Sequence, residues 1–540
     1  VTIDSLHLNY DKKWNPKLEM PTSTLLSDDE EMGWRMYKLS PAMKPGDSLL
    51  AHIETSYAPK GFENEMGSTS VIANGTFLNN FQILPSLGYD PNNELGDKNT
   101  RKKYGLPPKE RMPELEVNCG IACDNNYLSN GRADFVMVET VISTSGDQIA
   151  ISPGTLIKEW KEDGRNYFHY KLDHPSQNFY SFISARFEVK RKKWNGIDLE
   201  VYYDAKHPMN VDMMLAAMER SLTYYTEHFG PYYHKQCRII EFPRYASFAQ
   251  AFPGTMPYSE SIGFVTNLED EEGNNIIDAV IAHEMAHQWW AHQVVGANMQ
   301  GGTMMSESFA EYSSLMTMKK MNDDPMKMRE FQKYNHDRYL SGRSQEVEKE
   351  VPLYKVENQG HIHYGKGSLI LYTLQDYIGE AKVNLAMRNY LDEFKHKGPP
   401  YSTSLDFLKH LEPQVPDSLK HLITDWFKEI TLYDLRVIEA SYNTKPVNGK
   451  YELTMLVKAE KLKADTMGTE TPVAINDWID IGVLDKDEKK LIYQKRVKID
   501  QPEMTFTLLL DTIPVKAAID PRRLLIDRVY DDNVKVVDAE

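Results

Sequence analysis

The sequence predicts a multidomain α+β protein in which a mostly helical middle region lies between two β-rich regions. The chain has 540 residues, more than one hydrophobic core usually serves, and 41% of them are apolar. Apolar and polar residues alternate before about residue 207 and again after 434, which is the period of a half-buried strand. Between these positions the apolar residues recur at helical spacing. We therefore expect an N-terminal β-rich domain over 1–206, a mostly α domain over 207–434 and a C-terminal β-sandwich over 435–540.

Individual elements follow from the same patterns. Alternation predicts strands over 135–144 and 197–204, and paired strands over 451–457 and 504–510 in the C-terminal sandwich. After Asn210 the period becomes helical, and Gly230 with Pro231 ends the helix that follows. Further helices are expected over 276–294, 307–319, 366–378, 381–395 and 419–430.

Composition excludes some classes of function. The net charge of −17 argues against nucleic acid as a partner, because such proteins need clustered Lys and Arg to displace counterions. The sequence contains no run of about 20 apolar residues that could cross a bilayer, and its first ten residues lack the regions of a signal peptide. Cys119 and Cys123 could pair or could be two buried thiols, so the cysteines leave the compartment open.

One motif carries metal chemistry. His283-Glu284-Met285-Ala286-His287 lies within the helix expected from residue 276, so its two histidines, four residues apart, project from one face. A catalytic zinc needs three protein ligands and one open position, and this motif supplies two ligands with a carboxylate beside that position. We predict one Zn²⁺ per chain, held by His283 and His287, with Glu284 as the catalytic base.

The third ligand is expected from the next helix. Glu307 lies at its start, after one connection and a return toward the motif. Glu311 falls on the same face one turn later, and we predict Glu307 as the ligand. Glu311 is then a candidate to hydrogen-bond a ligand imidazole, as carboxylates near metal sites commonly do, or is an ordinary solvated glutamate.

These residues resemble a known family. His283-Glu284-Met285-Ala286-His287-Gln288-Trp289-Trp290, followed by Glu307-Ser308-Phe309-Ala310, is similar to the gluzincin zinc aminopeptidases, the family of aminopeptidase N and the leukotriene hydrolases. That family has one residue fewer between the two segments, and Asn and Gly where Ser306 and Ser308 stand. The resemblance implies that residues 207–434 form a thermolysin-like zinc catalytic domain. It also implies hydrolysis of the N-terminal peptide bond of peptide substrates by zinc-activated water, with Glu284 as general base.

Two further roles are implied by the same resemblance. Ser259-Glu260-Ser261-Ile262-Gly263 looks like the family's G-x-M-E-N segment, whose glutamate binds the α-amine of the substrate, so Glu260 is implied as the substrate-binding anchor. Tyr364-Gly365-Lys366-Gly367 looks like the family's Y-x-K-G segment, and Tyr364 is implied as the catalytic hydrogen-bond donor to the oxyanion.

The N-terminal region resembles a narrower group. Pro85-Ser86-Leu87-Gly88-Tyr89 and Tyr104-Gly105-Leu106-Pro107-Pro108 are similar to a bacterial subgroup in which the peptidase is fused to membrane-spanning segments of a transporter permease. This implies membrane-spanning segments outside the fragment, first strands that precede Val1, and an extracytoplasmic position for this part.

Two rival functions stay open at this point. A zinc endopeptidase or oligopeptidase is favoured if Glu260 does not face the site. A non-catalytic peptide-binding domain of a membrane transporter assembly would have no need of Glu284 or Tyr364.

Overall fold

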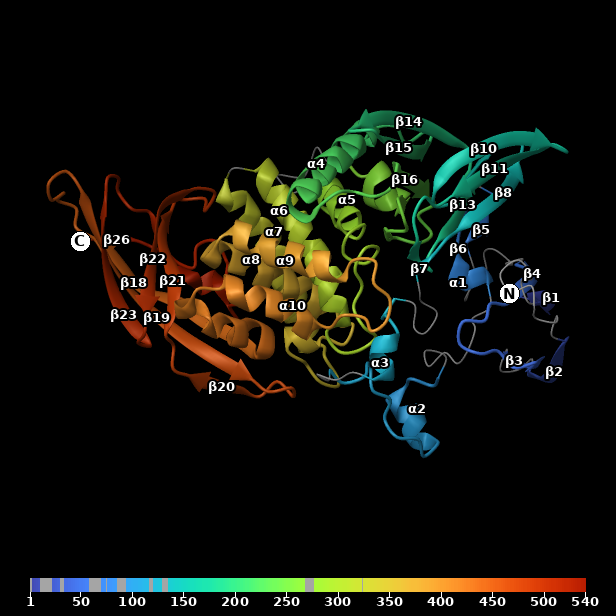
Figure 1. The fold of residues 1–540 in the computed structure, drawn as a ribbon. Helices are drawn as coiled ribbons and strands as arrows, with labels where there is room; N and C mark the ends of the chain where they lie inside the picture. Colours follow the sequence, from blue (N-terminus) through green and yellow to red (C-terminus); the bar gives the residue numbers. More distant parts are fainter. Residues whose placement is uncertain are drawn as a thin grey trace.

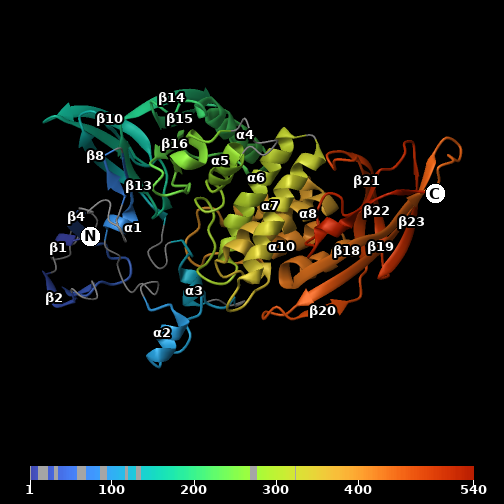
Figure 2. The same ribbon diagram turned by 180° about the vertical axis from the view of Figure 1, so that it is seen from behind.

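The computed structural model shows β structure at both ends of the molecule and helices between them (Figures 1 and 2). It describes residues 2–9, 22–29, 34–57, 69–73, 75–84, 94–115, 120–128, 135–267, 276–322 and 324–540. The predicted fold class is confirmed. The Pro85 to Tyr89 segment lies outside the described residues, so its resemblance is not tested by the structure.

The N-terminal region is built of small antiparallel sheets. One has the order β5-β6-β13-β9 and another the order β10-β11-β8, and three pairs of strands accompany short helices. The strands are β1 (Thr2–Asn9), β2 (Thr22–Asp29), β3 (Trp34–Ser40), β4 (Leu50–Ser56), β5 (Val71–Ile72), β6 (Gly75–Asn79), β7 (Phe135–Val136), β8 (Glu139–Ser145), β9 (Ile149–Ile151), β10 (Thr155–Glu162), β11 (Arg165–Lys171), β12 (Ser176–Gln177) and β13 (Ser181–Ala185). The helices are α1 (Asn80–Ile83), α2 (Lys98–Lys103) and α3 (Ile121–Asp124).

A four-stranded sheet leads into the helical region. Its order is β14 (Phe187–Trp194), β15 (Ile197–Asp204), β16 (Gln236–Phe242) and β17 (Thr255–Ser259), with β15, β16 and β17 parallel. Helix α4 (Val211–Phe229) connects β15 to β16, and Gly230 closes it at φ +115°, as the sequence predicted. Because this sheet joins strands on both sides of residue 206, the domain boundaries proposed from the sequence stay predictions.

The remaining helices pack around the centre of the molecule. They are α5 (Ile276–Ala286), α6 (Glu307–Met321), α7 (Pro325–Ser344), α8 (Gly367–Ile378), α9 (Glu380–Phe394) and α10 (Ser404–Leu411). Three π-helical turns are η2 (Glu260–Phe264), η5 (His361–Lys366) and η8 (Ile423–Lys428), and 3₁₀ turns are η3 (Gly302–Met305), η4 (Leu353–Lys355), η6 (Glu412–Gln414), η7 (Asp417–Leu419) and η9 (Tyr530–Asn533).

Two helix predictions need correction. The helix expected over 276–294 ends at Ala286, because the chain turns there to bury Trp289 and Trp290, whose indole N–H groups donate to Gly230 O and Ser313 Oγ at 3.0 Å each. The helix expected over 419–430 is only the turn η8, since strand β18 starts at Ile430. Helix α7 was not predicted, although Asp324 as N-cap and Pro325 at the first position are a recognised start signal.

The C-terminal region consists of two sheets, in agreement with the predicted β-sandwich. One contains β20 (Glu470–Val473), β19 (Tyr451–Ala464), β18 (Ile430–Tyr442) and β26 (Asp538–Ala539), with β23 (Glu503–Leu510) also paired to β19. The other has the order β22 (Leu491–Ile499), β21 (Asp477–Leu484), β24 (Lys516–Ile519) and β25 (Val534–Val536). Buried residues of both sheets share one hydrophobic core with the central helices.

Two further predictions concern cysteines and membranes. Cys123 is disulfide-bonded, so the alternative of two thiols is wrong for it, whereas Cys237 is a free, buried cysteine. Cys119 lies outside the described residues. Among the helices that the structure describes, none combines the length and the apolar character that crossing a membrane requires.

Candidate metal centre and active site

Helix α5 and the turn after it carry the two histidines of the motif. His283 lies in the last turn of α5, and His287 is the first residue beyond its end, not inside the helix as the sequence predicted. The two residues still have the i to i−4 hydrogen bond of a helix, because the backbone N–H of His287 donates to His283 O at 3.3 Å. Both imidazoles therefore face the same side.

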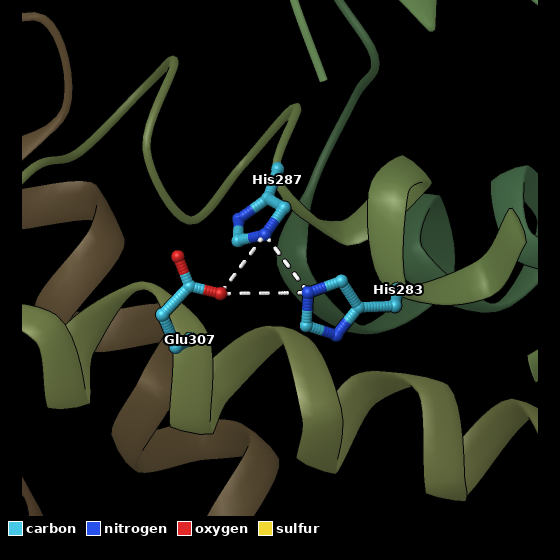
Figure 3. Close-up of side chains that lie close together, drawn as sticks. All are labelled: His283, His287 and Glu307. Carbon is cyan, nitrogen blue, oxygen red and sulfur yellow. Dashed lines mark hydrogen bonds and ion pairs between the residues drawn. The ribbon is translucent and has the colours of Figure 1, made fainter. Parts of the chain in front are cut away.

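The structure brings the three predicted ligands together (Figure 3). Glu307 is the first residue of α6, which packs against α5. Its Oε2 lies 3.5 Å from His283 Nε2 and 3.3 Å from His287 Nε2, and the two Nε2 atoms are 3.0 Å apart. Three predicted ligand atoms thus converge on one point from the last turn of α5, the residue after it and the start of α6.

The surroundings of these atoms fit a bound cation. His287 Nδ1 lies 3.1 Å from the carbonyl oxygen of Trp290, and as the donor in that bond it leaves the Nε2 lone pair facing Glu307. Glu307 Oε2 is buried and makes no hydrogen bond with any described residue. A buried carboxylate oxygen facing imidazole nitrogens is costly without a cation between them. The set of two imidazoles and one carboxylate is one that catalytic zinc takes.

Glu284 and Tyr364 border the same pocket. Its wall contains the three ligands, Glu284 and Tyr364, and its empty space, part of it open to solvent, is about 510 Å³. Burial is the main cause that raises the pKa of the Glu284 carboxyl above its usual range. Burial also raises the pKa of Tyr364, so its phenol keeps the proton and can donate it in a hydrogen bond. The pocket therefore holds a proton acceptor and a proton-bearing donor beside the ligands.

Glu311 lies near the imidazole of His283 but makes no hydrogen bond to it, so its role stays a prediction. Its Oε1 lies 3.5 Å from His283 Nδ1, the ring nitrogen that does not face Glu307. A carboxylate on that nitrogen fixes the orientation of a ligand imidazole.

Glu260 is not brought to this pocket. It follows β17 as the first residue of η2, where its Oε2 lies 3.9 Å from His207 Nδ1 and its Oε1 accepts a hydrogen bond from the backbone N–H of Arg244 at 3.1 Å. It is absent from the described residues that line the pocket, and its predicted role as amine anchor stays a prediction. The pocket wall on this side is formed by residues 249–251, which pair with β17.

Several pocket residues were not found from the sequence. Tyr127, Leu128 and Phe179 reach the pocket from the N-terminal region, and Gln250 and His292 line it as well. Tyr127 hydrogen-bonds through its hydroxyl to Ser306, the residue before Glu307. No local pattern marks these residues, because only long-range packing brings them to the site.

Two imidazoles and a carboxylate that converge beside a second glutamate are a set of residues that metallopeptidases use. Within that class, residues 213–426 match the model of the Peptidase family M1 domain, so this part of the chain is similar to M1 peptidases. The matched range includes Glu284, Tyr364 and all three predicted ligands.

Curated relatives are aminopeptidases and a tricorn-associated factor. The chain is 24% identical over 212 residues to Probable aminopeptidase 1 of Sulfurisphaera tokodaii, covering 38% of this chain and 26% of that protein. It is 26% identical over 210 residues to human Endoplasmic reticulum aminopeptidase 2, covering 38% and 22%. It is 21% identical over 375 residues to Tricorn protease-interacting factor F2 of Thermoplasma volcanium, covering 67% and 45%. The chain thus spans less than half the length of these relatives.

A solved structure supports the fold. The structure of Legionella pneumophila aminopeptidase A in complex with aspartic acid aligns with a TM-score of 0.51 and 15% sequence identity. The alignment covers 78% of this chain and 49% of that one.

Proposed function

We propose that this protein is a zinc metallopeptidase that hydrolyses the N-terminal peptide bond of peptides. The observation that carries the proposal is the convergence of His283 Nε2, His287 Nε2 and Glu307 Oε2, within 3.5 Å of one another, in a pocket that also contains Glu284. These three atoms would hold the zinc. The chemistry that zinc supplies when bound is Lewis acidity toward water and a peptide carbonyl.

Glu284 is the general base in this proposal. Its buried carboxylate directly follows His283 in sequence and lines the pocket with both histidines, where it can take a proton from the attacking water and return it to the leaving amine. The raised pKa of Glu284 makes its carboxylate a stronger base, which favours the first of these transfers, the uptake of the proton from water.

Tyr364 is the proposed oxyanion donor. It lines the pocket with its ring centroid 5.8 Å from that of His283, and its phenol remains protonated. A hydroxyl held there can hydrogen-bond the oxygen that becomes negative when water attacks the carbonyl.

The choice of the N-terminal bond over an internal one rests on the aminopeptidase names of the relatives. The position of Glu260 outside the described pocket lining does not support that choice and by itself would favour the endopeptidase or oligopeptidase alternative. The role of Glu260 as amine anchor stays a prediction, because Glu260 is absent from the described residues that line the pocket. From the likeness of residues 104–108 to permease-fused peptidases, we also propose membrane-spanning segments in the whole protein, which fractionation of the full gene product would test.

The function is tested by metal analysis combined with turnover of aminoacyl reporters that carry free or acetylated N-termini. We expect about one zinc per chain, its loss in His287→Ala, and cleavage of the free reporters. Equal cleavage of acetylated and free reporters would show that the enzyme does not require a free N-terminus, and the assignment would change from aminopeptidase to endopeptidase. Peptide binding without turnover would favour a non-catalytic peptide-binding domain.

A further inference from the structure

Arg338 connects two parts of the candidate site from outside the pocket. It lies in α7, and its guanidinium carbon stands 4.1 Å from the centroid of the Tyr364 ring. Its Nη1 lies 4.0 Å from Glu311 Oε1, the same oxygen that is 3.5 Å from His283 Nδ1. Arg338 is not among the described residues that line the pocket. Its contacts with the candidate site are those with Tyr364 and Glu311.

We propose that Arg338 is a positioning residue that orients Tyr364 for hydrogen bonding to the oxyanion and holds Glu311 against His283. This inference rests on the proposed function, since it assigns Arg338 a task only if Tyr364 is the oxyanion donor.

The close packing of α7 against the turn η5 makes this contact possible. A Cβ at Gly365 would lie 3.1 Å from Asn335 O and from Tyr339 N, and a Cβ at Gly342 would collide with the His361 side chain. Glycine at both positions lets the π-helical turn lie directly on the backbone of α7. The turn therefore places Tyr364 under Arg338, and π-helical turns of this kind are frequent at functional sites.

The charges around Tyr364 explain why an arginine stands there. After burial, the charges of Glu307, Glu284 and Glu311 are the main causes that raise the pKa of Tyr364. A cation over the face of the ring offsets that negative potential. Arginine suits this place better than lysine, because its planar group stacks on an aromatic face while its N–H groups reach a carboxylate.

The link to the metal centre runs through Glu311. Glu311 Oε1 lies between Arg338 Nη1 at 4.0 Å and His283 Nδ1 at 3.5 Å, at ion-pair distance from both and without a hydrogen bond to either. Removing Arg338 leaves Glu311 free to turn away from the imidazole. Loss of such outer partners typically lowers metal affinity by about 10- to 100-fold.

A double-mutant cycle tests the first part of the proposal. Arg338→Met should lower kcat by about tenfold with KM within about twofold of the parent, because a cation–π contact and the orientation of the donor are lost. In the Tyr364→Phe background the same change should alter kcat by less than about twofold. Arg338→Lys should not restore the parent rate. Lys333→Met is the matched control, since Lys333 lies on α7 but pairs with exposed Asp337.

Equal effects of Arg338→Met in both backgrounds would overturn the inference, because a merely structural arginine acts independently of Tyr364. If Tyr364→Phe alone keeps the parent kcat, the oxyanion role in the proposed function fails instead, and the Arg338 inference fails with it. The kcat of Tyr364→Phe therefore distinguishes failure of the proposed oxyanion role from failure of the Arg338 inference alone.

Zinc affinity, measured by chelator competition, gives a second readout that does not depend on turnover. Arg338→Met and Glu311→Gln should each weaken zinc binding by about tenfold, and the double variant should be no weaker than either alone. Unchanged affinity in Arg338→Met, or additive losses in the double variant, would contradict the link through Glu311.

Discussion

The hydroxyl of Tyr127 hydrogen-bonds to the hydroxyl of Ser306, and this contact ties the N-terminal region to the residue that precedes Glu307. Ser306 is the N-cap of α6, yet its side chain makes no capping hydrogen bond to that helix. A serine at this position usually caps the helix. Here the hydroxyl instead pairs with the half-buried phenol of Tyr127 on the wall of the candidate site.

We expect Tyr127→Phe to weaken zinc binding by about tenfold while the protein stays folded, because Ser306 loses the partner that fixes the start of α6 beside Glu307. Chelator competition measures the affinity. Tyr104→Phe is the control, since Tyr104 is 67% exposed. Parent affinity in Tyr127→Phe would show that α6 alone positions Glu307.

Glu284→Gln should retain stoichiometric zinc and lose turnover by about 10²- to 10⁴-fold, because the amide keeps the shape of the side chain but cannot accept a proton. Metal analysis and single-turnover kinetics on the same preparation measure both quantities. Glu227→Gln, an exposed change on α4, should leave both unchanged. Activity near that of the parent would remove Glu284 from the mechanism.

The placement of Glu260 beside His207 leads us to expect that Glu260→Gln leaves the ratio of kcat/KM for free and acetylated peptides unchanged. If Glu260 instead binds the α-amine of the substrate, Glu260→Gln should lower the ratio of kcat/KM for free over acetylated peptides. Removing one partner of a buried charge pair costs about 2 to 5 kcal/mol, so the substitution would then reduce cleavage of free peptides by well over tenfold. Measuring kcat/KM of the parent and of Glu260→Gln on free and on acetylated peptides decides whether Glu260 is the amine anchor.

Stability should depend on pH through Asp527, because burial raises the pKa of this carboxyl to about 7. The folded protein binds the proton more tightly than the unfolded chain, so this contribution is full below the unfolded pKa and is lost as pH rises through 7. Between pH 5 and 7 the loss amounts to about 2 kcal/mol.

Urea unfolding at pH 5 and pH 8 measures this effect. The difference in unfolding free energy between the two pH values should be smaller in Asp527→Asn than in the parent by about that amount. Asp511→Asn is the control, since the Asp511 side chain is 82% exposed. An unchanged pH difference in Asp527→Asn would show that this carboxyl does not control it.

Local spacing was sufficient to predict most of the elements around the metal centre. Four-residue separation on a helix brings two side chains to one face whatever the rest of the chain does, so His283 and His287 were predicted to lie together and do. The alternation over 197–204 predicted β15 for the same reason, since the period of a strand is a local property. The β-α-β order of the chain followed from summing such local signals.

Tertiary structure alone decided which distant residues complete the site. Tyr127 and Ser306 are 179 positions apart, and the stacking of Arg338 on Tyr364 depends on how closely α7 approaches η5. The end of α5 at Ala286 was set by burial of two tryptophans, and the place of Glu260 by the pairing of β17 with residues 249–251. These contacts depend on how elements pack against one another in three dimensions, which the period of a single element does not encode.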